Sequence, residues 1–291
     1  ENVKFSGLSW YADDGFYYSS YDEPKGSELT AKTDRHKLYY HRIGEDQAED
    51  QLIFGARDEE KHRYVSGYVT EDEYFLVIDA SNTTSGNKLF MKDLRRADQP
   101  LKTIVREDSG DIRVLYSNQD EIYAYTNLNA LNGKLIKFTL ENFEQTDWEI
   151  VIDESDNALH VDVAGGYFFA SYLKDAVTVT YQFDLSGRML REIFLPGKGT
   201  AFGFQGKKTQ ELTYFTFENY HTPPTIFSLD LNSGGTEIYR SSEAKFSSEG
   251  YQSRQVFFNS KDGTKIPMTI THKKNLELNQ PNPTILYGYG G

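Results

Sequence analysis

Residues 160–195 read HVDVAGGYFFASYLKDAVTVTYQFDLSGRMLREIFL, a segment that holds four candidate β-strands separated by turns. The turn residues are Ala164-Gly165-Gly166 after the first strand and Leu185-Ser186-Gly187-Arg188 after the third. The second strand is apolar on both faces, which is typical of a strand covered on both sides. The four expected strands are His160–Val163, Tyr167–Tyr172, Val177–Asp184 and Glu192–Leu195. This order predicts a meander of antiparallel hairpins.

The same arrangement of strands recurs along the chain. Its aromatic-rich strands are FYYSSY from Phe16, YFLVI from Tyr74, IYAYT from Ile122, YFFASY from Tyr167 and LTYFTF from Leu212. The strands that follow them are KLYYHRI from Lys37, KLFMKDL from Lys88, KLIKFTL from Lys134, VTYQFDL from Val179 and TIFSLDL from Thr225. Successive members of this second set start 51, 46, 45 and 46 residues apart.

A spacing in the mid-forties, without helical apolar periodicity, is typical of the four-stranded blades of a β-propeller. We therefore predict an all-β propeller with five blades between about Phe5 and Tyr239. A β-sandwich with evenly spaced hairpins is the alternative. Sandwiches rarely keep one period over five units, so the propeller is the better interpretation.

The charge and the amino-acid composition argue against some classes of binding partner. The formal charge of −13 and the isoelectric point near 5.0 argue against nucleic acid, because no basic surface would neutralise phosphates. They also disfavour anionic membranes, and no apolar run is long enough to span a bilayer. The absence of cysteine excludes disulfides and thiol chemistry, which fits the cytoplasm. A periplasmic location would require a signal peptide upstream of ENVKFSGLSW.

Other polar and aromatic features are expected to be structural. The six histidines show no metal-binding spacing, and no nucleotide-binding loop occurs, so we expect neither a metal nor a cofactor. The acidic runs Glu45–Asp50 and Asp58–Glu60 are expected to be solvated turns rather than catalytic carboxylates. Trp10 and Trp148 are expected to pack in the core or between blades.

A different pattern begins near Val256. Val256–Phe258 and Thr284–Tyr287 are expected strands, and Asp262-Gly263 is an expected hairpin turn. The second run leads directly into Tyr-Gly-Tyr-Gly-Gly. A strand that enters a Gly-rich turn is where an α/β-hydrolase builds an oxyanion hole. The nucleophile elbow of such an enzyme would have to follow Gly291.

These motifs resemble the prolyl oligopeptidase family. The similarity is carried by SKDGTKIPMTITHKK and NPTILYGYGG near the C-terminus, and more loosely by VKFSGLSW and KLYYHRIGEDQAEDQLIF among the blades. The resemblance implies a seven-bladed propeller, about five blades of which are present, followed by the first strands of an α/β-hydrolase domain. Residues 1–247 would be the partial propeller and residues 248–291 the start of the catalytic domain.

The resemblance also implies one catalytic residue in this chain. The second tyrosine of YGYGG, Tyr289, would donate its hydroxyl to the oxyanion of the tetrahedral intermediate. Gly288, Gly290 and Gly291 would allow the sharp turn beside it, and Tyr287 would lie in the core. The Ser, Asp and His of the triad would follow Gly291, so this chain alone should be inactive. The blade sequences do not indicate which loops line the entrance, so no substrate-binding residue is assigned on the propeller.

The implied function is that of a serine endopeptidase that cleaves short peptides on the carboxyl side of proline, with the propeller restricting access. Short proline-containing peptides would be its partners, and we expect a cytoplasmic monomer in the full-length form. Two alternatives remain at this point: a non-enzymatic propeller that acts as a binding module, and another oligopeptidase of the same clan, similar to oligopeptidase B or the dipeptidyl peptidases.

Overall fold

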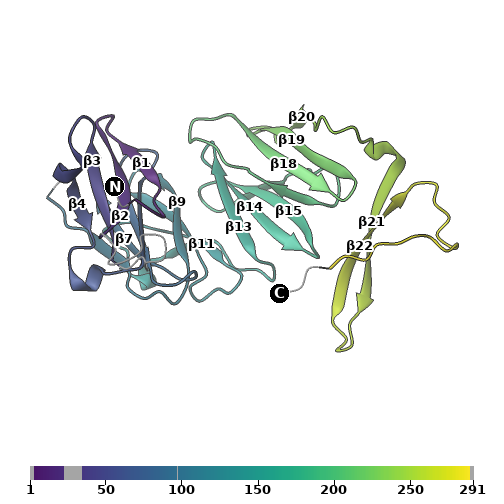
Figure 1. Cartoon of the computed structure of the whole chain (residues 1–291), viewed down its shortest axis with the longest axis horizontal. Helices are drawn as coiled ribbons and strands as arrows, with labels where there is room; N and C mark the ends of the chain where they lie inside the picture. The colour runs from purple at the N-terminus through teal and green to yellow at the C-terminus, as the bar shows by residue number, and fades with distance from the viewer. Residues whose placement is uncertain (1–2, 23–34, 97, 289–291) are drawn as a thin grey trace.

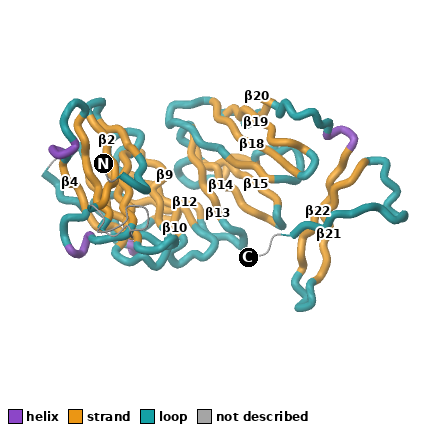
Figure 2. The backbone as a smooth tube through the Cα atoms, in the orientation of Figure 1, coloured by secondary structure: helices purple, strands orange, loops and turns teal. Residues whose placement is uncertain are grey.

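The computed structural model describes residues 3–22, 35–96 and 98–288, in which nearly all of the regular secondary structure is β-strand (Figures 1 and 2). Within these ranges the helical segments are four 3-10 turns: η1 (Gln47–Glu49), η2 (Asp58–Glu60), η3 (Gln145–Asp147) and η4 (Ser248–Gly250). None of these described helices has the length or apolar character to cross a membrane.

Five four-stranded antiparallel sheets follow one another along the chain. The first contains β1 (Leu8–Tyr11), β2 (Gly15–Tyr21), β3 (His36–Arg42) and β4 (Gln51–Phe54). The second contains β5 (Tyr64–Val69), β6 (Phe75–Ser81), β7 (Lys88–Asp93) and β8 (Lys102–Val105). The third contains β9 (Ile112–Asn118), β10 (Glu121–Thr126), β11 (Lys134–Phe138) and β12 (Glu149–Ile152).

The fourth sheet contains β13 (Leu159–Ala164), β14 (Tyr167–Lys174), β15 (Val177–Phe183) and β16 (Met189–Glu192). The fifth contains β17 (Thr200–Phe202), β18 (Leu212–Asn219), β19 (Thr222–Asp230) and β20 (Thr236–Arg240). In each sheet every strand pairs with the next strand in the chain. The five predicted four-stranded blades are confirmed.

The core consists of four apolar clusters, one between each pair of consecutive sheets. In each of the three middle sheets, the second strand contributes side chains to two of these clusters, because neighbouring side chains on a strand point to opposite faces. In β14, Phe168 packs toward the third sheet and Phe169 toward the fifth. In β6, Val77 and Ile78 divide in the same way between the third and first sheets. The double-sided apolar character seen in the sequence therefore marks strands between two blades.

Two local expectations are wrong. The outer strand of the fourth sheet is Met189–Glu192, not Glu192–Leu195, because the chain resumes pairing directly after the turn, with Met189 opposite Phe183. Trp10 is 58% exposed instead of packed in a core. It lies beside Phe16 on the outward face of the first sheet, and no described sheet covers that face.

A separate hairpin follows the fifth sheet (Figure 1). Its strands are β21 (Tyr251–Asn259) and β22 (Lys265–Lys273), which pair Val256 with Met268 and Phe257 with Pro267. The predicted strand at Val256–Phe258 and the predicted hairpin turn at Asp262-Gly263 are confirmed. At the tip, the Asp262 carboxylate accepts hydrogen bonds from Ser260 Oγ and from the Thr264 N–H, which fixes the turn.

The meander gives each sheet two distinct ends. Turns between first and second strands lie at one end, and turns between second and third strands lie at the other, together with the connections between sheets. The first strands of neighbouring sheets contact one another, β1 with β5 and β9 with β13. These contacts agree with the usual arrangement of a propeller, in which the first strand of each blade lies nearest the central axis.

Candidate functional site

The hairpin meets the propeller across a polar cleft of about 420 Å³. Three connections of the fourth and fifth sheets form the propeller wall: the β14–β15 turn, the β16–β17 loop and the β18–β19 turn. The facing wall comes from β21 and β22. The residues that line the cleft include Lys198, Glu218, Tyr220, Ser253 and Arg254.

Hydrogen bonds attach the hairpin to these connections. Lys198 Nζ donates to Gln255 Oε1 at 3.1 Å, and Gln255 Nε2 donates to the backbone carbonyl of Asp175. His221 Nδ1 lies 2.7 Å from Ser253 Oγ, which also shares a 2.8 Å hydrogen bond with Thr271 Oγ1. Phe257 and Phe258 of the hairpin remain 38% and 49% exposed, so these polar contacts are a major part of the attachment.

Asn219 shapes the propeller wall of the cleft. Its side-chain oxygen accepts the backbone N–H groups of His221 at 3.1 Å and Thr222 at 2.8 Å, which fixes the tight turn between β18 and β19. Its amide group donates to the Lys198 carbonyl at 3.3 Å and thereby links this turn to the β16–β17 loop. The His221 ring is presented to Ser253 by this local folding.

The His221–Ser253 pair has the spacing of a base and a nucleophile but lacks the other parts of a catalytic site. Among the described residues, no carboxylate is hydrogen-bonded to His221, and the Ser253 hydroxyl is also engaged by Thr271. We interpret the pair as a contact that positions the hairpin. Sequence reasoning missed it, since 32 residues separate the partners and neither lies in a motif.

The residue predicted to carry the chemistry is Tyr289. Tyr289, Gly290 and Gly291 lie outside the described residues, so the oxyanion role of Tyr289 stays a prediction. Thr284–Tyr287 was expected to be a strand, but it has no strand pairing in the described part of the chain. Tyr287 was expected in the core and is 77% exposed. A β-strand requires a hydrogen-bonding partner, and no described strand lies against this segment.

The acidic runs are mostly exposed, as expected, but their last residues, Asp50 and Glu60, are exceptions. The Asp50 side chain is only 2% exposed and accepts hydrogen bonds from Tyr18 Oη at 2.5 Å and His41 Nδ1 at 2.7 Å. Glu60 is buried and binds the Arg57 side chain and the Gly55 N–H. Burial acts to raise the pKa of Glu60, but these hydrogen bonds outweigh it and hold the pKa below its usual range. Both carboxylates stabilise loops of the first blade.

A second hollow, of about 510 Å³, lies on the outward face of the first sheet beside Asp50. Leu8, Phe16 and Tyr18 line it. In each of the other four described sheets, the face turned toward the preceding sheet is packed against that sheet. This hollow is therefore interpreted as a blade-packing surface rather than a ligand site.

Comparisons with known proteins agree with the propeller. Residues 1–242 match the family model described as the prolyl oligopeptidase N-terminal beta-propeller domain. Over all 291 residues, the chain is 47% identical to a prolyl endopeptidase of Elizabethkingia miricola and 46% identical to that of Elizabethkingia meningoseptica. It covers 41% of the length of each of these relatives.

Solved structures give the same result. A structure described in a mechanistic analysis of two prolyl endopeptidases has a TM-score of 0.83 with 24% identity, which supports the fold alone; the match covers 95% of this chain and 41% of that one. Prolyl oligopeptidase B of Galerina marginata, bound to a 25-residue macrocyclization substrate, has a TM-score of 0.80 and 26% identity, with 95% and 40% coverage.

Proposed function

This chain belongs to the prolyl oligopeptidase family, and we propose that it is the propeller-containing part of a serine endopeptidase that cleaves short peptides on the carboxyl side of proline. The observation that carries the proposal is the identity of 47% and 46% to two prolyl endopeptidases, which extends over the whole chain and includes the segment after the propeller. The chain spans 41% of the length of these relatives, so the activity belongs to the longer protein.

We assign residues 248–291 to the start of the catalytic domain. The family model for the propeller ends at residue 242, and β21 and β22 form a sheet of their own. Apolar side chains after the propeller are exposed, including Phe258 at 49%, Ile285 at 95% and Leu286 at 85%. Such a concentration of exposed apolar groups supports a segment that is covered by further parts of the same domain.

The propeller would restrict access to the catalytic domain. Its sheets are tightly packed against one another through four apolar clusters, so peptides cannot pass between blades without separating them. The polar cleft beneath the hairpin is the place where the two parts meet. A few hydrogen bonds between exposed side chains contribute little net stability, so this junction could open during substrate entry.

The decisive experiment uses the protein extended to the length of its curated relatives. We expect it to hydrolyse a chromogenic Gly-Pro substrate, to lose activity with a serine-directed inhibitor, and to cleave the Gly-Ala analogue far more slowly. The 291-residue chain alone should be inactive. Equal cleavage of the two substrates would contradict proline specificity. Peptide binding without turnover by the extended protein would favour the alternative of a binding module.

Tyr289→Phe in the extended protein tests the oxyanion assignment. The change removes one hydroxyl and keeps the ring, so the acylation rate constant should fall by roughly 10²–10³ while substrate binding changes much less. Tyr287→Phe is the matched control, because it removes the same hydroxyl from a tyrosine two residues away that has no assigned role in the reaction. Near-normal turnover of Tyr289→Phe, or a loss explained by a lower thermal midpoint, would assign Tyr289 a structural role.

A further inference from the structure

The loop between β17 and β18, residues 203–211, crosses the end of the propeller opposite the hairpin. We call it the strap. Two backbone hydrogen bonds anchor it to the fourth sheet: the Gly206 N–H donates to the Val163 carbonyl at 2.9 Å, and the Gly165 N–H donates to the Lys207 carbonyl at 2.9 Å. These contacts place the strap over the turn between the first and second strands of that sheet.

Lys208 connects the strap to the second and third sheets, which are distant from it in the sequence. Its backbone N–H donates to the two carboxylate oxygens of Glu71 at 3.0 and 3.1 Å. Its Nζ donates to Asp72 Oδ2 at 2.6 Å and to the Ser117 carbonyl at 2.5 Å. Nζ also lies 4.7 Å from the centre of the Tyr116 ring, within cation–π range. One residue of the fifth sheet therefore contacts the second and third sheets together.

The acceptor for Lys208 is held in place by its own sheet and the next one. Asp72 Oδ1 accepts hydrogen bonds from Thr70 Oγ1 at 2.6 Å and the Tyr74 N–H at 3.2 Å, and Oδ2 accepts one from Ser117 Oγ at 2.7 Å. Burial acts to raise the pKa of Asp72, but Lys208 and these donors outweigh it and keep the pKa low. The Asp72 carboxylate is thus held in position as a charged acceptor for Lys208.

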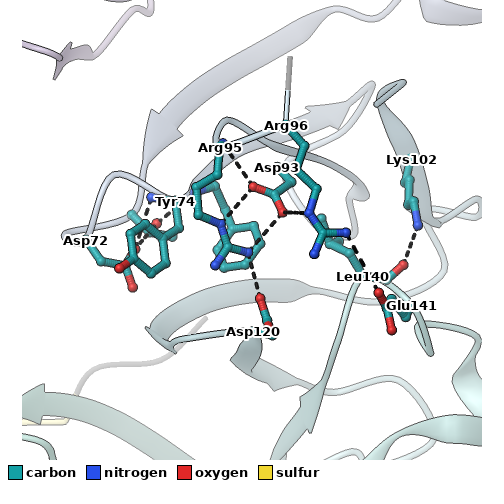
Figure 3. A network of polar contacts seen from close by, with 11 residues as sticks. Asp72, Tyr74, Asp93, Arg95, Arg96, Lys102, Asp120, Leu140 and Glu141 are labelled. Atoms are coloured by element: carbon teal, nitrogen blue, oxygen red, sulfur yellow. Dashed lines mark hydrogen bonds and ion pairs between the residues drawn. The ribbon is translucent and has the colours of Figure 1, made fainter. Parts of the chain in front are cut away.

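A network of ion pairs around Arg95 lies beside Asp72 and Tyr74 (Figure 3). The Arg95 guanidinium lies 4.5 Å from the centre of the Tyr74 ring and pairs with Asp93 at 2.9 Å and Asp120 at 2.7 Å. Asp120 belongs to the turn after β9, the strand that carries Ser117. Arg95 therefore connects the two turns between which Lys208 is inserted.

We propose that the strap spans the axial end of the propeller and that Lys208 is the latch that holds it closed on Asp72. First strands surround the channel of a propeller, so a loop joined to three other sheets at or next to their first-to-second turns obstructs that channel. The side chains of Lys208 and Asp72 are 19% and 14% exposed, so water reaches the ion pair and the latch can open without separation of the blades. A cavity of about 170 Å³ lies beneath it. This inference does not rest on the proposed peptidase activity.

Hydrogen exchange of backbone amides in the 291-residue chain tests the latch. Lys208→Met keeps the apolar stem over Tyr116 and removes the charge, and Asp72→Asn removes the charge of the acceptor. We expect each variant to accelerate exchange of the strap amides at least tenfold, with changes below twofold in the central strands of the five sheets. The double variant should exchange no faster than the faster single variant, because both changes break the same contact.

Lys207→Gln is the matched control. In the described part of the chain, the Lys207 side chain makes no hydrogen bond or ion pair, so this variant should exchange like the wild type. Strap exchange within twofold of wild type in both test variants would overturn the proposal, because the other contacts of the strap, including the buried Phe204 ring and the Lys208 N–H bonds to Glu71, would then hold it without the ion pair. Equal acceleration throughout the five sheets would also overturn it, since Lys208 would then stabilise the fold as a whole.

Discussion

The Asp79 carboxyl lies in the contact between the second and third sheets, where Asn87 Nδ2 donates to its Oδ1 at 2.9 Å. The same Asn87 side chain donates to the Ile112 carbonyl at 3.0 Å and accepts the Ile112 N–H at 2.8 Å. Asn87 thus joins two blades, and Asp79 is enclosed behind that junction. Burial raises the pKa of Asp79 to about 7, although the Asn87 hydrogen bond and the charge of Arg113 oppose this increase.

This raised pKa predicts a pH-dependent free energy of unfolding. The folded protein favours the protonated carboxyl, so the stability that Asp79 contributes is fully present below about pH 4, its ordinary pKa range, and is lost as the pH rises through 7. Asp79→Asn should therefore raise the thermal midpoint relative to wild type at pH 8 and change it little at pH 4. The difference between the ordinary pKa and the raised pKa limits this effect to about 4 kcal/mol.

The measurement is thermal unfolding of wild type and variant at both pH values. Asp147→Asn serves as control, because Asp147 is exposed in η3 and the change should have the same small effect at each pH. An equal stabilisation by Asp79→Asn at pH 4 and pH 8 would show that its effect comes from packing rather than from ionisation.

At the scale of the strand, β14 can be used to test whether its two faces pack in separate apolar clusters. The Phe168 ring centre lies 5.2 Å from that of Tyr123 in the third sheet, and the Phe169 ring stacks 5.6 Å from Phe204, which lies in the strap between β17 and β18 of the fifth sheet. Both side chains are fully buried. Phe168→Leu and Phe169→Leu should each reduce the free energy of unfolding by about 1–2 kcal/mol, through a small cavity on opposite faces of one strand.

Hydrogen exchange distinguishes the two variants. Phe168→Leu should accelerate exchange more in β10 of the third sheet, and Phe169→Leu should accelerate it more in β18 of the fifth. Each variant is the other's matched control, since the chemical change and the strand are the same. The same exchange pattern in both would contradict the division of β14 between two apolar clusters.

The packing of one strand in two apolar clusters also explains why the blades could be predicted from the sequence. A strand between two blades must be apolar on both faces, so residues such as Tyr167–Tyr172 revealed their place through local composition. The contacts of His221 with Ser253 and of Lys208 with Asp72 left no such trace, because they join residues that are 32 and 136 positions apart. Burial of Asp50 was missed for a similar reason: Tyr18, one of its partners, is 32 residues away.

At the scale of the whole molecule, the hairpin should be dispensable for propeller stability. Residues 241–250 connect the two parts and are exposed apart from one partly buried position. A chain that ends at residue 245 should therefore unfold within about 2 °C of the 291-residue chain, because the lost hydrogen bonds are few and solvent-exposed.

Calorimetry of the two chains measures this difference. A chain that ends at residue 233 is the control; it lacks β20, the outer strand of the fifth sheet, and should unfold at a clearly lower temperature. A large loss of stability in the chain ending at residue 245 would mean that β21 and β22 are part of the propeller fold.

Each of the five propeller sheets is made of four consecutive strands, and this local order has a consequence for biosynthesis. A nascent chain can complete one blade on the ribosome before the next has been translated, because no pairing within the sheet waits for a distant segment. The newest blade then exposes an apolar face until its successor emerges. The region most vulnerable to aggregation or chaperone capture should therefore move along the polypeptide during translation, one blade at a time.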